Sequence, residues 1–336
     1  MAGIRDLRRI QLAKEVYGYG TPVTPTTQLV GMLDATENRN RVFPEEASGF
    51  MSSHRRAYDQ SVIAELSFDA GDEGATFEQL IIFLAMCAQG GVIPTPVAPA
   101  GWNWLFDPDL ENGDLPDIFT FRYGDNQQCW ESEGVFGTEL ALSGATEEPW
   151  RLTSELRGDQ MAQAVFAPLI TYPTPLETIL AQMTRLYIND TWATLGDTLI
   201  EGTLIDWSVT LPGFHPKFFQ DGQVVYSDIG LASRALAVNF TFEFNTEANA
   251  ERLLWVAATP RFIRLEATGG IINPGVPPDR KFARIDMCVV YEGTDPLDER
   301  DGNDIMRFTG RTVNDGTTFP GNDWRFVVQN GIPDLP

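Results

Sequence analysis

Histidine is almost absent from this sequence. Among 336 residues there are two, His54 and His215, and both fall in stretches that we expect to be loops. A histidine-based catalytic triad or a histidine-rich metal site is therefore poorly supplied. The HExxH, P-loop, GxGxxG and GxSxG patterns are missing as well. We predict a protein that is not an enzyme and holds no cofactor. An enzyme would need clustered carboxylates with raised pKa values in one pocket.

Ligand spacing for a metal ion is also missing. The acidic stretch 107–114 resembles a calcium loop, but Asn112 stands where that loop needs glycine and Ile118 where it needs glutamate. The acid-rich stretch 295–304 lacks ligand spacing and is interpreted as a solvated turn. We predict no metal site.

Cysteine is scarce, and its spacing shows no paired motif. The three residues, Cys87, Cys129 and Cys288, are odd in number, widely spaced and without a CxxC pair. This indicates reduced thiols, two of them in apolar runs, and fits assembly in a reducing cytoplasm.

Basic residues are few. Lys and Arg number 24 against 47 Asp and Glu, which gives a formal net charge of −23. Proteins grip a nucleic-acid backbone by neutralising phosphates with Lys and Arg, so a chain this acidic is expected to repel one.

Long hydrophobic runs are missing too. The most apolar run, residues 80–88, is far shorter than the roughly 20 residues of a membrane helix. The N-terminal residues carry scattered charges and no apolar core of a signal peptide. The sequence predicts a soluble protein with no membrane step.

What the sequence does contain is a strand-then-helix unit that occurs twice. Residues 61–69 and 234–244 alternate apolar and polar side chains, the pattern of a strand with one buried face. Each is followed by a polar turn and an apolar helical segment, at 76–88 and 247–258. The alternative is two unrelated β segments that look alike.

The surroundings of both copies also correspond. Upstream of each lie a glycine, a short apolar run and a long loop rich in aromatic and charged residues; Gly/Pro linkers and closing strands follow. We therefore predict an internal duplication, with units at 1–175 and 176–336. The expected fold is mainly β, with antiparallel β-sandwich or barrel units that each carry one flanking α-helix and a long loop or hairpin.

Further elements are expected from local pattern. The sequence favours a short helix over 5–17 and a surface loop or projecting hairpin over 35–60, with turns at Gly134, Gly137 and Gly144 and an acidic loop at 292–304. The remaining expected strands are 29–34, 117–123, 130–142, 150–156, 203–211, 282–291, 306–313 and 323–328.

The opening of the chain resembles a known family. The phrase from Lys14-Glu15 to Gly20-Thr21-Pro22, placed before the first strand, is similar to the start of major tail tube proteins of long, non-contractile-tailed bacteriophages. The repeated order of strand, long loop, strand, helix and closing strands also resembles the tail tube fold, over most of the chain.

The resemblance implies a structural virion protein of the siphophage tail. Six tail-tube-like units form a ring, rings stack into a hollow tube, and DNA passes through without specific binding. A chain with two units would form homotrimers of pseudo-sixfold symmetry, although a hexamer stays open. The implied partners are further copies of the chain, a tape measure protein in the lumen, and tail terminator and distal tail proteins. The implied location is the virion tail, assembled in the host cytoplasm.

Two residue sets are proposed on this basis. The polar faces of the repeated strands and their partners are the candidate lumen surface, with solvent on the outside as the alternative: Glu65, Ser67, Asp69, Asp206, Ser208, Thr241 and Glu243. Aromatic and apolar residues of the long loops are candidate inter-subunit contacts, since exposed aromatics mark interfaces: Phe43, Phe50, Met51, Phe214, Phe218 and Phe219.

Two other functions remain open. One is another β-rich virion or assembly subunit, which oligomer geometry would distinguish. The other is a soluble carbohydrate-binding β-sandwich that uses Trp102, Trp104 and Trp130, which a flat tryptophan platform and monomeric behaviour would favour.

Overall fold

A computed structural model describes most of the chain. The described residues are 7–16, 20–45, 49, 54, 56–97, 99–109, 113–173, 175–231, 233–275, 277–300, 302–316 and 323–336, without the side chains of 296 and 297. Twenty strands and two α-helices lie among them, so the prediction of a mainly β protein is confirmed.

The first half of the chain holds ten strands and the helix α1 (Phe77–Cys87). The strands are β1 (Arg9–Lys14), β2 (Thr27–Leu29), β3 (Met32–Val42), β4 (Tyr58–Asp69), β5 (Thr95–Val97), β6 (Gly101–Phe106), β7 (Phe119–Gly124), β8 (Cys129–Ala145), β9 (Arg151–Gly158) and β10 (Met161–Ala164).

The second half holds ten more strands and the helix α2 (Thr246–Val256). The strands are β11 (Thr184–Asn189), β12 (Leu199–Ile200), β13 (Leu204–Pro212), β14 (Phe214–Lys217), β15 (Asp228–Leu231), β16 (Ala237–Glu243), β17 (Arg261–Asn273), β18 (Asp279–Arg300), β19 (Asn303–Thr312) and β20 (Trp324–Asn330).

The pairing of the strands repeats between the halves. In the first half β1 pairs with β2 and β7, β7 with β8, β8 with β9 and β10, β9 with β4, and β4 with β3. In the second half β11 pairs with β12 and β17, β17 with β18, β18 with β19 and β20, β19 with β16, and β16 with β13. All of these pairs are antiparallel, so the two halves share one order of pairing.

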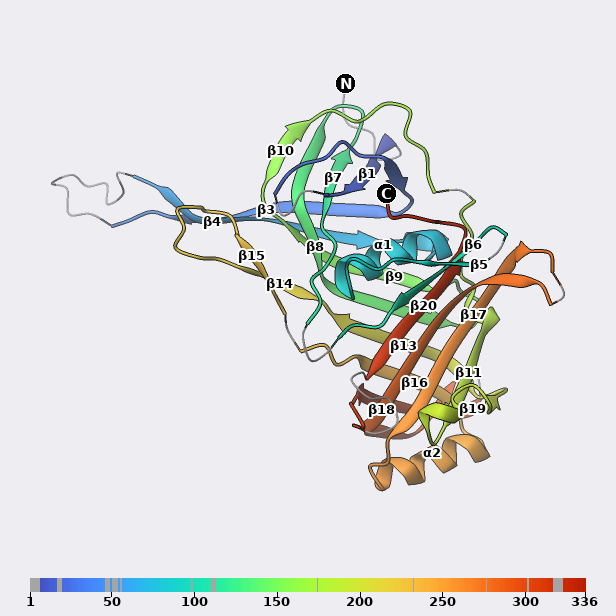
Figure 1. The fold of residues 1–336 in the computed structure, drawn as a ribbon. Helices are drawn as coiled ribbons and strands as arrows, with labels where there is room; N and C mark the ends of the chain where they lie inside the picture. The colour runs from blue at the N-terminus through green and yellow to red at the C-terminus, as the bar shows by residue number, and fades with distance from the viewer. Residues whose placement is uncertain are drawn as a thin grey trace.

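Two long strands belong to two layers each. The last part of β8 pairs with β9 and β13, and the last part of β18 pairs with β19, which gives an eight-stranded sheet in the order β3-β4-β9-β8-β13-β16-β19-β18. The first parts of β8 and β18 lie in smaller second layers with β1-β7 and β11-β17-β20. Two strand pairings join the halves: β8 with β13 within the eight-stranded sheet, and β6 with β20 in the second layer (Figure 1).

The two helices occupy contrasting places. All residues of α1 are buried, as expected for a helix that is apolar on all sides after Glu78 and Gln79 of its first turn, and it packs against β8 and β20 in the middle of the molecule (Figure 1). α2 buries only Ala248 and Glu251 and lies at one end. Both begin in the same way: the side chains of Thr76 and Asn245 accept hydrogen bonds from the backbone N–H three residues later.

The predicted helix over 5–17 is wrong. Residues 9–14 form β1, which lies between β2 and β7. The side chain of Gln11 is buried and exchanges two hydrogen bonds with the backbone of Ala167, at 3.0 and 2.9 Å. Pairing with segments more than 100 residues away overrides the local helical pattern.

The predicted turns in the middle of β8 are also wrong. Gly134, Gly137 and Gly144 all lie inside this strand. A Cβ at Gly137 would lie 2.0 Å from the sulfur of Cys87, and one at Gly144 would lie 2.6 Å from the Trp207 indole nitrogen. Glycine at these two positions permits close packing of α1 and Trp207 on the strand.

Two predicted loops prove to be hairpins. β18 continues to Arg300 and β19 starts at Asn303, so the acidic stretch 292–304 is mostly strand. Of the two readings of 35–60, the projecting hairpin is right: β3 and β4 extend out of the body as an arm (Figure 1). The expected strand 29–34 is divided between β2 and β3, with Gly31 between them.

Candidate assembly surface

The seven residues predicted to face a lumen share one face of the eight-stranded sheet. Paired residues of neighbouring strands lie on the same face. Ser67 pairs with Glu155, Glu155 with Glu139, and Glu139 with Pro212, which leads from β4 to β13. Asp206 pairs with Thr241, which leads to β16. The structure thus brings together residues more than 170 positions apart. That this face lines a lumen stays a prediction.

The two faces of this sheet differ sharply. Leu66, Phe68, Val209, Phe240 and Phe242 point to the other side and are at most 1% exposed in the core. On the polar face, Ser67, Asp69 and Glu243 are exposed, and Glu65, Asp206 and Ser208 are half-buried. Thr241 is the exception at 5% exposed. It is flanked in register by Asp206 and Arg307, whose longer side chains stand on either side of it.

Arginine side chains on this polar face have acidic partners. The ion pairs are Arg157 with Glu65 at 3.8 Å and with Glu155 at 3.9 Å, Arg151 with Glu148 at 3.0 Å, Arg300 with Asp206 at 3.0 Å, Arg307 with Asp298 at 3.2 Å and Arg311 with Glu292 at 2.9 Å. Each pair is partly exposed and contributes little stability. Their electrostatic consequence is larger, because the cations of this face are already neutralised.

Both ends of the eight-stranded sheet are open edges in the described part of the chain. β3 pairs along one side only, with β4. β18 pairs with β17 as far as Val289, and beyond this residue its described pairing is to β19 alone. Unpaired edges of this length readily pair with another strand. In the repeated order of pairing, β3 corresponds to β13 and β18 corresponds to β8. Inside the chain β13 and β8 pair with each other, from Asp206 with Ala145 to Pro212 with Glu139.

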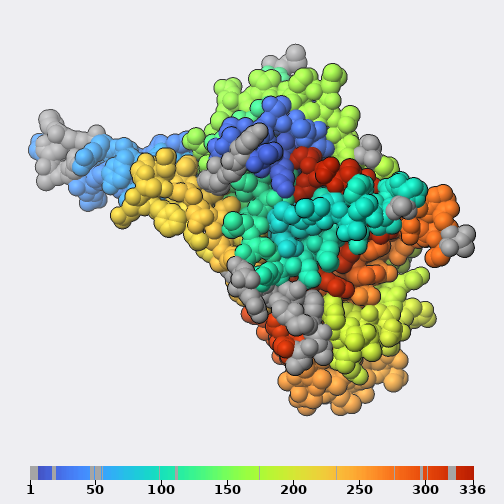
Figure 2. Space-filling model, in the orientation of Figure 1, coloured from blue at the N-terminus to red at the C-terminus, as the bar shows by residue number. Residues whose placement is uncertain are grey.

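The predicted contact aromatics are distributed over the arm and its neighbour. Phe43, Phe218 and Phe219 are 55%, 45% and 56% exposed, so they are available to a neighbouring chain. Phe50 and Met51 lie outside the described residues. Figure 2 shows the segment before β15 seated beside the base of the arm, where Val62 N–H donates to the Val224 carbonyl at 2.8 Å.

Phe214 does not fit its predicted role. It is 2% exposed and packs with Phe136 and Tyr226 inside its own chain, with the Arg234 guanidinium 4.7 Å from its ring centroid. The loop that carries it turns back as the hairpin β14–β15 and buries this first residue. Phe214 is therefore unavailable for contact with a neighbouring chain.

The thiols and the candidate metal ligands can be located in the described part of the chain. Among the described residues, no group of three or more His, Cys, Asp or Glu could hold a metal ion. All three thiols are buried, and burial raises the pKa of Cys87 and Cys288 to about 12 and that of Cys129 to about 11, so they stay protonated. Trp104 is 1% exposed and donates its indole N–H to the Ile332 carbonyl, so it cannot form a platform for a sugar.

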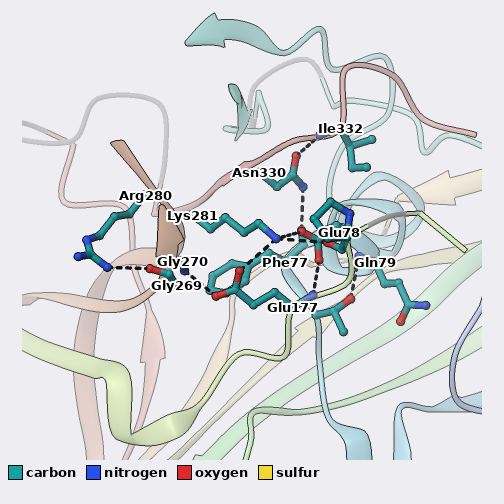
Figure 3. A network of polar contacts seen from close by, with 12 residues as sticks. Phe77, Glu78, Gln79, Glu177, Gly269, Gly270, Arg280, Lys281, Asn330 and Ile332 are labelled. Carbon is teal, nitrogen blue, oxygen red and sulfur yellow. Dashed lines mark hydrogen bonds and ion pairs between the residues drawn. The ribbon is translucent and has the colours of Figure 1, made fainter. Parts of the chain in front are cut away.

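Sequence reasoning missed a buried ion cluster between the halves. Lys281 of β18 lies 2.6 Å from Glu78 of α1 and 3.1 Å from Glu177, and Asn330 of β20 donates to the Phe77 carbonyl at 2.8 Å (Figure 3). Burial raises the pKa of Glu78, while the hydrogen bond from Lys281 acts in the opposite direction. Glu78 and Lys281 are 203 positions apart, so no local signal could have found this pair.

No protein-family model matches this sequence, and no curated protein sequence matches it either. No helix among the described residues combines the length and the apolar character needed to span a membrane.

Proposed function

We propose that this protein is the structural subunit of a hollow tube, the tail tube of a long, non-contractile-tailed bacteriophage. The observation that carries the proposal is the repeated strand pairing. It leaves two unpaired edges, β3 and β18, at opposite ends of the polar sheet, and these are the counterparts of β13 and β8. The β8–β13 pairing joins the two halves within the chain. A β18–β3 pairing between chains would repeat that joint.

The register of this second joint follows from the first. Thr36 of β3 pairs with Glu65, three residues before Phe68, as Ser208 of β13 pairs with Asn239, three residues before Phe242, so β3 takes the place of β13. Ser143 of β8 pairs with the first residue of β9, as Arg300 of β18 pairs with the first residue of β19. Transferring the β8–β13 register sets Arg300 opposite Thr36 of the next chain and Asp298 opposite Asn38.

The charges along the two open edges support this register. In this register Asp298 of β18 lies opposite Asn38 and so beside Arg39, and Asp295 faces the end of β3 that carries Arg41. Within their own chain Arg39 pairs with Glu37 and Asp59, and Arg41 pairs with Asp59, so these arginines would be shared with the acidic edge of the neighbouring β18. Head-to-tail joining of identical chains forms a ring when the rotation closes. Three chains with two units each would give the pseudo-sixfold ring expected from the sequence.

The polar face supports the role of a conduit wall. Its cations are paired with carboxylates, and the chain carries a net charge of −23. DNA would find few free cations on such a wall and would pass without being retained. A tape measure protein in the lumen, and terminator and distal tail proteins at the ends, belong to this proposal.

The arm supports contacts between stacked rings. It extends beyond the body as a hairpin and carries the exposed Phe43 (Figures 1 and 2). Exposed aromatic side chains on a projecting element are typical of a protein interface.

Electron microscopy of the purified protein tests the proposal. The protein is concentrated and incubated warm, while light scattering follows a dilute sample. We expect hollow tubes of stacked rings, with a mass of three chains per ring. A compact monomer at every concentration, with no ring or tube, would refute the proposal.

A further inference from the structure

Within the chain, the first turn of α1 docks against the second half. Phe77 N–H donates to the Glu177 carbonyl at 3.1 Å, and Asn330 of β20 holds the Phe77 carbonyl. Gly269 of β17 lies so close that a Cβ there would be 2.6 Å from the Phe77 ring. Glu78, in the same turn, reaches Lys281 of β18. Figure 3 shows these side chains converging on the start of the helix. An aromatic ring and an acidic residue of the helix thus meet a glycine and a lysine of the sheet.

The first half has the corresponding surface, and there it is hollow. Ile10 of β1 pairs with Tyr123 as Leu186 of β11 pairs with Leu265, so β1 and β7 occupy the places of β11 and β17. A cavity of about 570 Å³ opens here among β1, β2, β3, β7 and β8. Its apolar lining includes Ile10, Leu29, Leu33, Tyr123, Trp130 and Met161.

The helix that corresponds to α1 is exposed at the opposite end of the chain. α2 has the same length and the same type of N-cap, and Glu247 stands two residues after Asn245 as Glu78 stands two residues after Thr76. Glu247 is exposed, and Phe244 just before the helix is 38% exposed. On the outer surface of the helix, Leu253 and Val256 are 61% and 68% exposed.

We infer that the start of α2, with Phe244 and Glu247, docks into this cavity of a second copy of the chain. The inference rests on the proposed head-to-tail ring and adds a second contact to it. The docking would copy the contact that α1 makes with the second half of its own chain. The cavity also borders β3, the open edge that β18 of the neighbouring copy would join.

Charge supports this choice of partner. Arg8 and Arg9 line the cavity, as Lys281 lines the surface that receives Glu78. In the described part of the chain Arg8 forms an ion pair with Asp34, at 3.6 Å, and both side chains are more than half exposed. A pair this exposed costs little to rearrange. Glu247 of the incoming helix would therefore compete with Asp34 for Arg8, and it would approach Arg9, which lies 6.0 Å from the centroid of the Phe166 ring.

The amino-acid composition of the two helices fits their different exposure to water before assembly. α1 is buried within its own chain, so after Glu78 and Gln79 of its first turn it can be apolar on all sides. α2 faces water until a second copy arrives, and its exposed surface mixes Leu253 and Val256 with Glu247, Asn249 and Arg252. Interfaces between chains that also exist separately keep such a mixed composition.

Reversal of the charge at Glu247 tests the inference. Glu247→Arg should raise the protein concentration needed for assembly about tenfold or more, because two arginines would then face a third at the joint. Combining it with Arg8→Glu and Arg9→Glu in one chain should restore assembly. Glu73→Arg, the same charge change at an exposed residue outside α2 and the cavity, is the matched control. Thermal unfolding of each variant shows that the subunit is folded.

The outcomes separate the two proposals. Tubes that form from Glu247→Arg at the wild-type concentration would overturn the docking and leave the tube intact. A triple variant that stays unassembled would overturn the pairing with Arg8 and Arg9. Small oligomers that depend on Glu247 but never form tubes would overturn the tube alone. A wild type that stays monomeric overturns both.

Discussion

Lys281 shows how one buried cation joins distant parts of the chain. It contacts Glu78 and Glu177, and its side chain is 8% exposed while that of Glu78 is 1% exposed. Burying the two charges costs solvation, which their mutual attraction and hydrogen bonds offset. Removing one partner leaves the other charge buried without compensation, which is the costly case. The cluster therefore specifies how α1 sits against β18 more than it adds net stability.

We expect Lys281→Met to lower the free energy of unfolding by about 3–5 kcal/mol, because Glu78 would stay buried without its cation. Denaturant titration of the monomer measures this loss. The double variant Glu78→Gln with Lys281→Met should recover most of the loss, since no buried charge remains. A single variant as stable as the wild type would show that Glu78 does not depend on Lys281.

The pH dependence of the same variant gives a second readout. Burial raises the pKa of Glu78 above its unfolded value, and Lys281 lowers it. A carboxyl with a raised pKa binds its proton more tightly in the folded state, so stability is lost as the pH rises through the folded pKa and regained as it falls. Without Lys281 that pKa rises further. Lys281→Met should therefore regain stability on acidification more than the wild type does.

At the scale of elements, the two open edges of the eight-stranded sheet are the notable feature. Soluble proteins usually protect such edges with charge, bulges or a covering segment. β18 carries acidic residues, and both β3 and β18 contain bulges, between Arg39 and Arg41 and between Asp295 and Asp298. The acidic residues and the bulges hinder pairing of β18 with a second β18, and they still permit β18 to pair with β3.

Charge reversal on the β18 edge tests this arrangement. Asp295→Lys with Asp298→Lys should raise the concentration needed for assembly about tenfold or more, because lysines on the proposed register would then stand beside Arg39 and Arg41. Light scattering against concentration measures the shift. Glu147→Lys with Glu148→Lys is the matched control, since it changes two acidic residues and breaks a similar surface pair, Glu148 with Arg151. Equal effects of both double variants would argue for a general charge effect and against the edge.

At the scale of the whole molecule, composition and placement of charge act together. The net charge of −23 repels a polyanion at long range. At short range the arginines of the polar face pair with carboxylates, so few unpaired cations remain there to bind a phosphate. An assembly that turns this face inward would have a wall to which DNA does not adhere.

Assembled particles provide the test of this property. Wild-type tubes should not retain double-stranded DNA in sedimentation at about 0.1 M salt, the range in which charges beyond about 10 Å are screened. Particles with Glu65→Lys, Asp69→Lys and Glu243→Lys should retain it, and the retention should fall steeply as salt rises. Glu73→Lys, Asp197→Lys and Glu201→Lys make the same charge change outside the eight-stranded sheet. Equal retention by both triple variants would place the effect elsewhere than on the polar face.

The local sequence pattern was sufficient to predict elements whose tertiary contacts favour the same secondary structure as the pattern does. The alternation in β4 and β16 predicted both strands and their buried apolar residues, because a strand with one buried face needs that period. Phe244, expected on the buried face, is the exception, since it follows the end of β16 and is 38% exposed. The apolar run of α1 predicted a core helix, and the long stretch before β4 predicted either a surface loop or a projecting hairpin, of which the hairpin is present. The polar residues Glu65, Asp206 and Glu243 were grouped correctly on one face for the same reason.

The sequence by itself thus determined the mainly β character, the burial of α1 and the acidic, cation-poor surface, because these depend on composition and short-range period. The tertiary structure alone decided that residues 9–14 form a strand, that Phe214 is buried, that β8 joins β13 and that Lys281 meets Glu78. These features depend on contacts between residues far apart in the chain. The free energy of such a contact is realised only when both partners are in place, so neither segment reveals it alone.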